Sequence, residues 1–159
     1  YQDALERKFA AQSRVSVIKA AASDKPGTVT FHETNLRGSG SLLQVGQLAK
    51  DAYGTQEAEV FEVEAITIDS VSDDSEIDCL WIDVQGAELM VLKGATQTLA
   101  NTRSIFTEVS VHPNLYKGGV TLAELESFLN PLGFRVVLLG LDKDNLTGNA
   151  FFVRQSVAA

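Results

Sequence analysis

The apolar residues of this chain fall into runs that predict an alternation of strands and helices. Residues 15–22 form a nearly continuous apolar run, as expected of a parallel strand that is covered on both faces. Residues 28–33 and 60–66 alternate polar and apolar positions, as half-exposed strands do. Further strands are expected at 78–84, 104–111, 134–141 and 149–155. Helices are expected at 2–12, 42–53, 87–101 and 121–132, the last beginning with a capping box of Thr121 and Glu124.

The order of these elements predicts an α/β fold. Strands alternate with helices until the chain closes with two strands joined by a short turn, which suits an antiparallel hairpin. The strands at 15–22, 78–84 and 104–111 are therefore expected to run parallel. The strand at 149–155 should lie antiparallel between 104–111 and 134–141.

Length and composition limit the kinds of protein that this chain can be. A chain of 159 residues with 45% apolar and 21% charged residues fits one globular domain, spanning 1–159. The formal charge of −8 disfavours nucleic acid and anionic membranes as partners. No window approaches the length of an apolar membrane span. The single cysteine, Cys79, excludes an internal disulfide framework and is expected to be buried, so a cytoplasmic protein is the simplest prediction.

The stretch 80–95 carries the most informative chemistry. An apolar strand ends at Asp83, the chain turns at Gly86, and helical spacing follows. In open α/β sheets, ligands bind beyond the carboxyl ends of parallel strands, which is where Asp83 would lie. From the residues alone, a site carboxylate and a helix cap or solvated strand end are equally good interpretations of Asp83.

The same stretch resembles the signature of the FkbM-type methyltransferases, approximately D-[VI]-[EQ]-G-x-E followed by L-K-G-A. It stands here as Asp83-Val84-Gln85-Gly86-Ala87-Glu88, with Leu92-Lys93-Gly94-Ala95 after it, and Gln85 takes the place of the commoner Glu. Further segments similar to the family lie at 22–31, 38–42, 66–69 and 106–109. The resemblance implies a Rossmann-like class I methyltransferase sheet, mostly parallel with one antiparallel strand near the C-terminus.

The resemblance also implies S-adenosylmethionine as cofactor and O-methylation of a sugar or other small-molecule hydroxyl. It favours Asp83 as a catalytic base or as a contact to the charged end of the cofactor. Glu108, an acid in a strand otherwise fit for burial, is a second catalytic candidate, with a partnered structural carboxylate as the alternative. His112 titrates near neutral pH and is a third candidate, although a solvent-exposed loop histidine is the simpler interpretation.

Four further residues complete the predicted site. Ser23 and Asp24 follow the strand at 15–22, where related folds contact adenine, so they are expected to bind the cofactor. Glu88 and Ser41 are expected to contact the acceptor substrate. Glu88 can instead serve only to complement the positive end of its helix. No metal-binding motif is present in the sequence.

One family feature is missing from the chain. We find no glycine-rich turn that follows a buried strand and opens a helix, the usual grip on a nucleotide cofactor. In the resembling family this turn lies upstream of the predicted helix at 2–12. We expect the sequence to be an N-terminally truncated methyltransferase domain rather than a naturally shortened relative. The alternative function is a non-catalytic interaction domain that keeps the fold without the cofactor.

Overall fold

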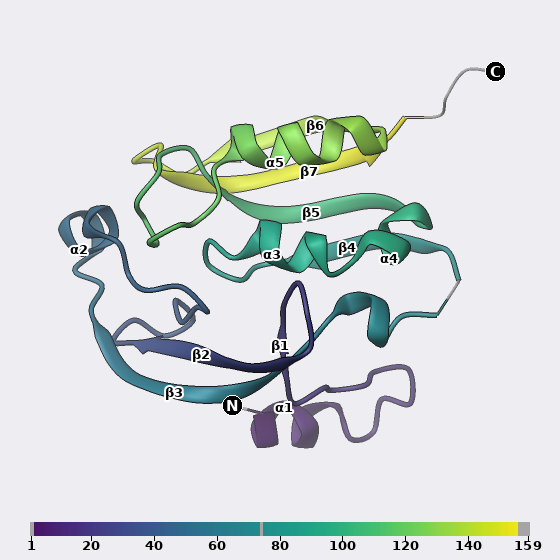
Figure 1. Ribbon diagram of the computed structural model, residues 1–159, viewed down its shortest axis with the longest axis horizontal. Helices are drawn as coiled ribbons and strands as arrows, with labels where there is room; N and C mark the ends of the chain where they lie inside the picture. The colour runs from purple at the N-terminus through teal and green to yellow at the C-terminus, as the bar shows by residue number, and fades with distance from the viewer. Residues whose placement is uncertain (1, 74, 156–159) are drawn as a thin grey trace.

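The computed structural model describes residues 2–73 and 75–155, and these residues form two β-sheets (Figure 1). A three-stranded sheet has the order β1-β3-β2, and a four-stranded sheet has the order β4-β5-β7-β6. The strands are β1 (Ala21–Ala22), β2 (Gly27–Thr34), β3 (Glu57–Ile66), β4 (Ile77–Ile82), β5 (Thr102–Ser110), β6 (Phe134–Leu141) and β7 (Thr147–Arg154). The helices are α1 (Gln2–Phe9), α2 (Gln47–Tyr53), α3 (Glu88–Lys93), α4 (Thr96–Ala100) and α5 (Leu122–Leu129), with 3₁₀ turns η1 (Ile68–Ser70) and η2 (Asn130–Leu132).

The predicted fold class, one mostly parallel Rossmann-like sheet, is wrong for this structure. Only β1 with β3 and β4 with β5 pair in parallel, whereas β2 with β3, β5 with β7 and β6 with β7 pair antiparallel among the described residues. The antiparallel pairing of β2 with β3 follows from their alternating sequences, because a strand with one solvated face suits an antiparallel sheet. The three-stranded sheet lies beside β4 without a strand pairing the two sheets (Figure 1).

The strand expected at 15–22 shrinks to the two residues of β1. Val15 and Ile18 are 42% and 50% exposed, so this apolar run is not covered on both faces. A buried parallel strand needs cover on both faces of its sheet, and the exposure of Val15 and Ile18 shows that this cover is incomplete. The interpretation of this run as a covered central strand is therefore wrong.

The C-terminal half follows the predicted pairing. β4 and β5 run parallel, and β7 lies antiparallel between β5 and β6. The capping box of Thr121 and Glu124 is present at the start of α5. The single helix expected at 87–101 is instead α3 and α4, which are separated at Gly94. The structure thus confirms the strand order of this half, and the signature turn lies at the carboxyl end of β4.

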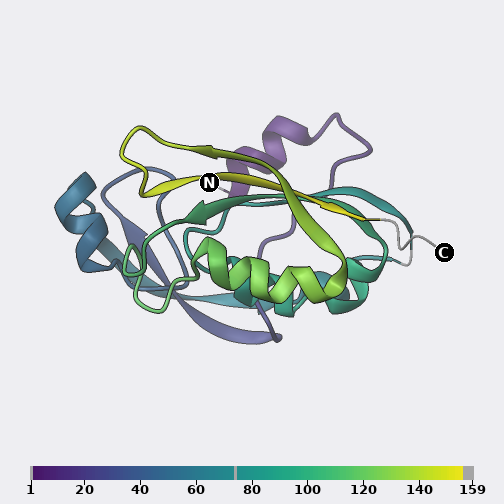
Figure 2. The ribbon, with the colours of Figure 1, turned by 90° about the horizontal axis from the view of Figure 1, so that it is seen from above.

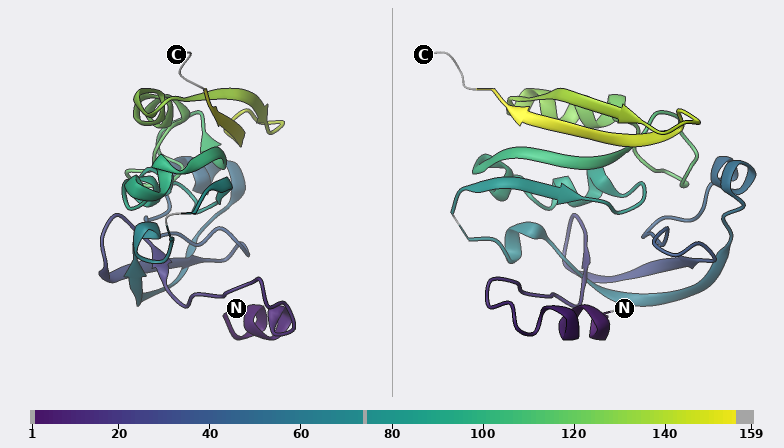
Figure 3. Two further views of the ribbon diagram at one scale, coloured as in Figure 1. Left: turned by 90° about the vertical axis from the view of Figure 1, so that its right-hand side faces the viewer. Right: turned by 180° about the vertical axis from the view of Figure 1, so that it is seen from behind.

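Helices α3, α4 and α5 cover the same face of the four-stranded sheet (Figures 2 and 3). The residues that point into this layer are fully buried, among them Ile105, Phe134 and Phe152. The alternate residues point to the other face, where Trp81 is 72% exposed although it stacks on Phe106. Cys79 is also exposed, so the expectation that it is buried is wrong; it lies two residues before Trp81 in β4, a strand at the edge of the sheet.

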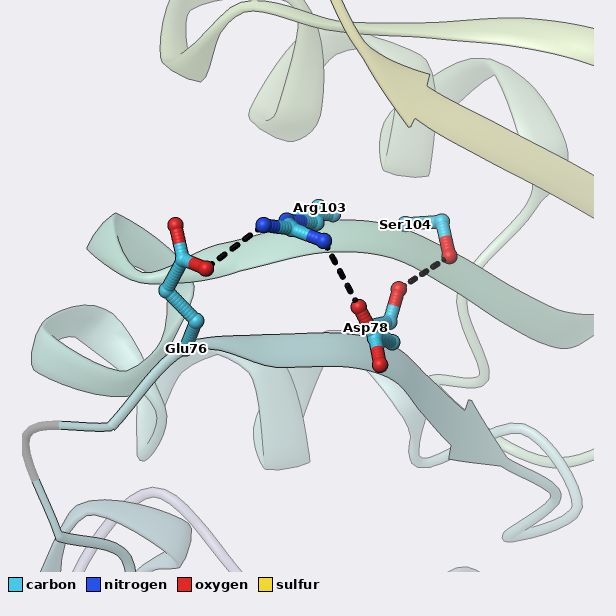
Figure 4. A network of polar contacts seen from close by, with 4 residues as sticks. All are labelled: Glu76, Asp78, Arg103 and Ser104. Atoms are coloured by element: carbon cyan, nitrogen blue, oxygen red, sulfur yellow. Dashed lines mark hydrogen bonds and ion pairs between the residues drawn. The ribbon is translucent and has the colours of Figure 1, made fainter.

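Polar contacts join β4 to β5 at the end remote from the signature turn (Figure 4). The Arg103 guanidinium lies 3.0 Å from an Asp78 carboxylate oxygen and 2.5 Å from a Glu76 oxygen. Ser104 donates a hydrogen bond of 2.6 Å to the Asp78 carbonyl oxygen. Exposed ion pairs of this kind contribute little stability, so their main effect is to favour the register of the two strands.

Within residues 2–73 and 75–155, no helix has the length and apolarity needed to cross a membrane.

Gly94 provides a test of the contact between the turn joining α3 to α4 and the segment that follows β1. A Cβ atom at Gly94 would overlap the backbone carbonyl oxygen of Ser23, which follows β1. Gly94→Ala is therefore expected to lower the free energy of unfolding by about 2 kcal/mol or more, because backbone on both sides must shift. Gly140→Ala in β6, where the added Cβ has no neighbour within 4 Å, is the matched control and should cost less than about 1 kcal/mol. Equal losses in chemical denaturation would contradict this packing.

Candidate functional site

The turn after β4 has an unusual backbone. Gln85 and Gly86 both have positive φ values, 55° and 94°. Glycine adopts this region freely, whereas a glutamine there is strained. A Cβ at Gly86 would lie 3.1 Å from the Cβ of Tyr116, so only a residue without a side chain allows this close packing. The Gly86 carbonyl also accepts a hydrogen bond of 3.0 Å from the amide of Val120, which fixes the turn against the loop that carries Tyr116.

Glu88 supports the same turn from the buried side. Its side chain is 2% exposed, and its Oε1 accepts a hydrogen bond of 3.0 Å from the Gly86 amide. Burial raises the pKa of the Glu88 carboxyl, and the backbone hydrogen bonds only partly oppose that rise. A buried acid is costly unless it is partnered, and the buried amide of Gly86 in this tight turn is the partner here.

A cluster of four polar side chains lies at the carboxyl end of β4, beside the last residues of β5. The Gln85 amide nitrogen Nε2 lies 2.7 Å from Asp83 Oδ1 and 2.7 Å from Glu108 Oε2. The Tyr116 hydroxyl lies 2.8 Å from the Ser39 carbonyl oxygen and 3.0 Å from Gln85 Oε1. It can donate its single proton to either of these acceptors. We call Asp83, Gln85, Glu108 and Tyr116 the Gln85 cluster. The parallel pairing of β4 with β5 brings the two carboxylates to the same edge of the sheet.

A cavity of about 120 Å³ borders the Gln85 cluster. Glu108, Gln85 and Tyr116 contribute to its polar wall. Its apolar side comes from four segments and consists of Leu36, Ala49, Val109 and Leu115. The residues around it carry hydroxyl, amide and carboxyl groups, and none of these described residues is Lys, Arg or His. The cavity is therefore suited to hydroxyl groups and unsuited to anions.

The surroundings of Glu108 change its ionisation. Burial, and then the negative charges of Asp83, Glu88 and Asp142, raise the pKa of the Glu108 carboxyl from 4.5 to about 8. Burial is also the main cause of a raised pKa at the Tyr116 hydroxyl, followed by the charge of Glu108. At neutral pH, Glu108 is therefore mostly protonated but lies close to the pH at which it ionises. A group with such a pKa is well matched to proton transfer under physiological conditions.

Comparison with known proteins identifies the family. The model of the FkbM methyltransferase domain matches residues 4–136. The chain belongs to the FkbM methyltransferase family. The 2-O-methyltransferase NoeI of Sinorhizobium fredii (strain NBRC 101917 / NGR234) is 32% identical over 126 residues, which cover 73% of this chain and 51% of NoeI. The chain thus spans about half the length of this curated relative. No solved structure matches the chain.

The structure brings two of the three catalytic candidates of this FkbM domain together. Asp83 and Glu108 share the Gln85 amide, as described above. His112 is exposed and borders a surface groove with Asp51 and Leu146 and a small hollow that Tyr116 also borders, but it does not contribute to the 120 Å³ cavity. Asp83 itself is exposed and does not contribute to the 120 Å³ cavity, whereas Glu108 does. Glu108 is therefore the better placed of the two acids to contact a molecule in that cavity.

The residues predicted to contact cofactor and acceptor lie nearby in the FkbM domain. Ser41 is buried, and its hydroxyl accepts a hydrogen bond from the Leu43 amide and contacts the Val84 carbonyl oxygen at 3.4 Å. Ser23 is buried, and its hydroxyl lies 3.2 Å from Asp24. Asp24 is exposed and borders a second hollow, of about 200 Å³, which also reaches Gly86. The roles of Ser23, Asp24, Ser41 and Glu88 stay predictions.

Two members of the Gln85 cluster were missed as site residues. Gln85 lies inside the signature, but its side chain carries no charge, and the sequence identified it only as a replacement for the commoner Glu. Tyr116 lies in the loop at 112–119, where its position after Asn114 and before Gly118 signals a tight turn rather than a site. Its contact with Gln85 depends on how the loop packs, which no local pattern encodes. The described residues hold no group of three His, Cys, Asp or Glu side chains able to bind a metal ion.

The raised pKa of Glu108 predicts how stability depends on pH. Between pH 4.5 and about 8, the unfolded chain loses the Glu108 proton while the folded chain keeps it, so stability falls as the pH rises. Glu108→Gln removes this group, and the fall in melting temperature between pH 5.5 and 8.5 should shrink. Glu62→Gln, on the exposed surface of β3, is the matched control. An unchanged slope in Glu108→Gln would show that the carboxyl titrates normally.

Proposed function

We propose that this domain transfers a methyl group from S-adenosylmethionine to a hydroxyl group of an uncharged small molecule. Membership of the FkbM methyltransferase family supports methyl transfer. By its name, the relative NoeI methylates an oxygen atom. The observation that carries the proposal is Glu108, a carboxyl with a pKa of about 8 in the wall of a cavity rich in hydroxyl and amide groups.

The described residues fit part of S-adenosylmethionine. This cofactor supplies a methyl group on a positively charged sulfur and carries an adenine base. Asp24, beside the hollow bordered by Leu43 and Met90, offers a carboxylate for the adenine amino group and apolar surface for its ring. Asp83, exposed at the end of β4, is the acid we assign to the positively charged end of the cofactor. Attraction between opposite charges would favour binding at this position.

Glu108 is the group that we assign as the general base. When a hydroxyl oxygen gains a methyl group, its proton must leave, and a carboxylate within hydrogen-bond reach can receive it. Ionised Glu108 accepts the proton and becomes the neutral acid that its buried position favours. Tyr116 and Gln85 border the same cavity and can orient the acceptor hydroxyl beside Glu108.

The charge of the cavity argues for the class of acceptor. Glu88 and Glu108 border it, and none of the described residues around it supplies a positive charge. A phosphate or carboxylate on the acceptor near this wall would meet repulsion that no cation offsets. Methyl glucoside, glucuronate and glucosamine are suitable probes, since they differ mainly in charge, and transfer should exclude glucuronate. A preference for glucuronate would contradict this assignment of acceptor class.

Substitution of Glu108 tests the proposed base. In the full-length protein, Glu108→Gln should lower turnover by roughly 10²–10⁴-fold, the usual effect of losing a general base. Wild-type turnover should rise with pH and level off above about 8, since Glu108 must be ionised to act. The Gln variant should lack this rise. A variant with wild-type turnover would remove Glu108 from the mechanism.

Two controls assign the effect to Glu108. Asp83→Asn keeps the shape of the side chain and should cost less than about 1–2 kcal/mol of stability, because the position is exposed. Since it removes a charge that raises the pKa of Glu108, it should move the rate profile to lower pH. His112→Asn, outside the 120 Å³ cavity, should leave the profile unchanged. A larger loss in His112→Asn than in Glu108→Gln would transfer the role of base to His112.

A further inference from the structure

The side chain of Gln85 touches every other member of the Gln85 cluster. Its Nε2 atom lies 2.7 Å from a carboxyl oxygen of Asp83 and 2.7 Å from one of Glu108, and its Oε1 atom lies 3.0 Å from the Tyr116 hydroxyl. An amide nitrogen has two hydrogen atoms, one for each carboxyl group. The opposite orientation would bring the amide oxygen against two acceptors, so the contacts determine which way the amide faces.

The backbone of Gln85 is held in an unfavourable conformation. Its φ of 55° lies in the left-handed region, which costs a residue with a side chain roughly 1–2 kcal/mol. The neighbouring Gly86 packs against Tyr116 and hydrogen-bonds to Val120, so the surrounding structure imposes the turn. A glycine at position 85 would adopt this conformation without strain. This conformation directs the Gln85 side chain toward the Asp83 and Glu108 carboxyl groups. Strained backbone of this kind is typical of functional sites.

We infer that Gln85 is a positioning residue, whose amide holds the Asp83 and Glu108 carboxyl groups together and limits how many protons the pair binds. This inference deepens the proposed function and rests on it, since it supplies the proton-accepting geometry of Glu108. Two adjacent carboxylates repel each other, and the amide offsets the repulsion by donating to both. The bond to Tyr116, which also contacts the Ser39 carbonyl, keeps the amide from rotating away.

Charged and titratable groups face Glu108 from four elements. Asp83 faces it from the turn after β4, Glu88 from α3, Asp142 from the turn between β6 and β7, and Tyr116 from its loop. Gln85 lies 2.7 Å from Glu108 and carries no charge. A carboxylate in its place would add a further negative charge among these groups and would remove both donors.

Gln85→Glu tests the protonation part of the inference. The folded variant should bind about one more proton than the wild type near neutral pH, because three adjacent carboxyl groups cannot all ionise. Its stability should therefore fall more steeply with rising pH than that of the wild type. In the full-length enzyme, the pH midpoint of turnover should move upward by about one unit or more. An unchanged slope and an unchanged midpoint together would overturn the inference.

Gln85→Gly tests the positioning part. Glycine relieves the strained backbone, so the melting temperature should stay the same or rise. Turnover at pH 8 should nevertheless fall about 10–100-fold, while KM for the acceptor stays within about threefold, because Glu108 is no longer held in place. A glycine variant with wild-type turnover would overturn the inference. A variant that instead loses stability would show that Gln85 acts on the fold.

Gln47→Glu is the matched control. Gln47 donates a hydrogen bond of 2.8 Å to Asp51 on α2, so the substitution again places a carboxylate beside a carboxylate. This pair is exposed, and water screens it, so neither the stability slope nor the rate profile should change. An equal shift in Gln47→Glu would mean that the change at Gln85 reflects overall charge.

Separate measurements test the role of Gln85 and the proposed methyl transfer. The stability slope of Gln85→Glu requires no catalysis. A full-length protein that neither binds S-adenosylmethionine in calorimetry nor transfers methyl groups would contradict the proposed function and favour the non-catalytic interaction domain. An active enzyme with unaffected Gln85 variants would contradict only the inference.

Discussion

The close packing of Gly86 against Tyr116 is the contact on which the site depends. Gly86 has no side chain, so the turn after β4 can approach the Tyr116 ring, and the Val120 amide and the Glu88 carboxyl hydrogen-bond to it from different elements. This packing fixes the direction in which the Gln85 side chain leaves the backbone. A larger residue at position 86 would strain the backbone at its positive φ and would force the Tyr116 side chain to shift.

Burial of acidic groups is the second feature that unites the structure. The chain carries an excess of acidic residues. It buries Glu88, five residues after Asp83, and half-buries Glu108 on the neighbouring strand β5. Such an arrangement costs stability, because each carboxyl must stay protonated or find donors. Glu88 has the Gly86 amide, and Asp83 and Glu108 share the Gln85 amide. Buried acids that lower stability at the edge of a cavity are typical of sites that transfer protons.

Local sequence patterns predicted the C-terminal half of the molecule better than the N-terminal half. The strands around Phe106, Phe134 and Phe152 have partners within the chain, so their apolar patterns and their pairing agree. The apolar run around Ile18 has no such cover, and the two sheets do not join into one parallel sheet. Asp83 and Glu108 could be identified as site candidates because each is an acid in an apolar strand or at its end. Gln85 and Tyr116 could not, since their roles arise from a loop that packs on a distant turn.

The proposed role of Glu108 requires that the fold raise the pKa of its carboxyl close to neutral pH. Carbon-13 NMR of the Glu108 side-chain carboxyl in the full-length protein, assigned by comparison with Glu108→Gln, measures this directly. We expect a titration midpoint near pH 8, well above the ordinary value of 4.5. A midpoint close to 4.5 would contradict it, because Glu108 would then be an ordinary ionised carboxylate throughout the physiological range.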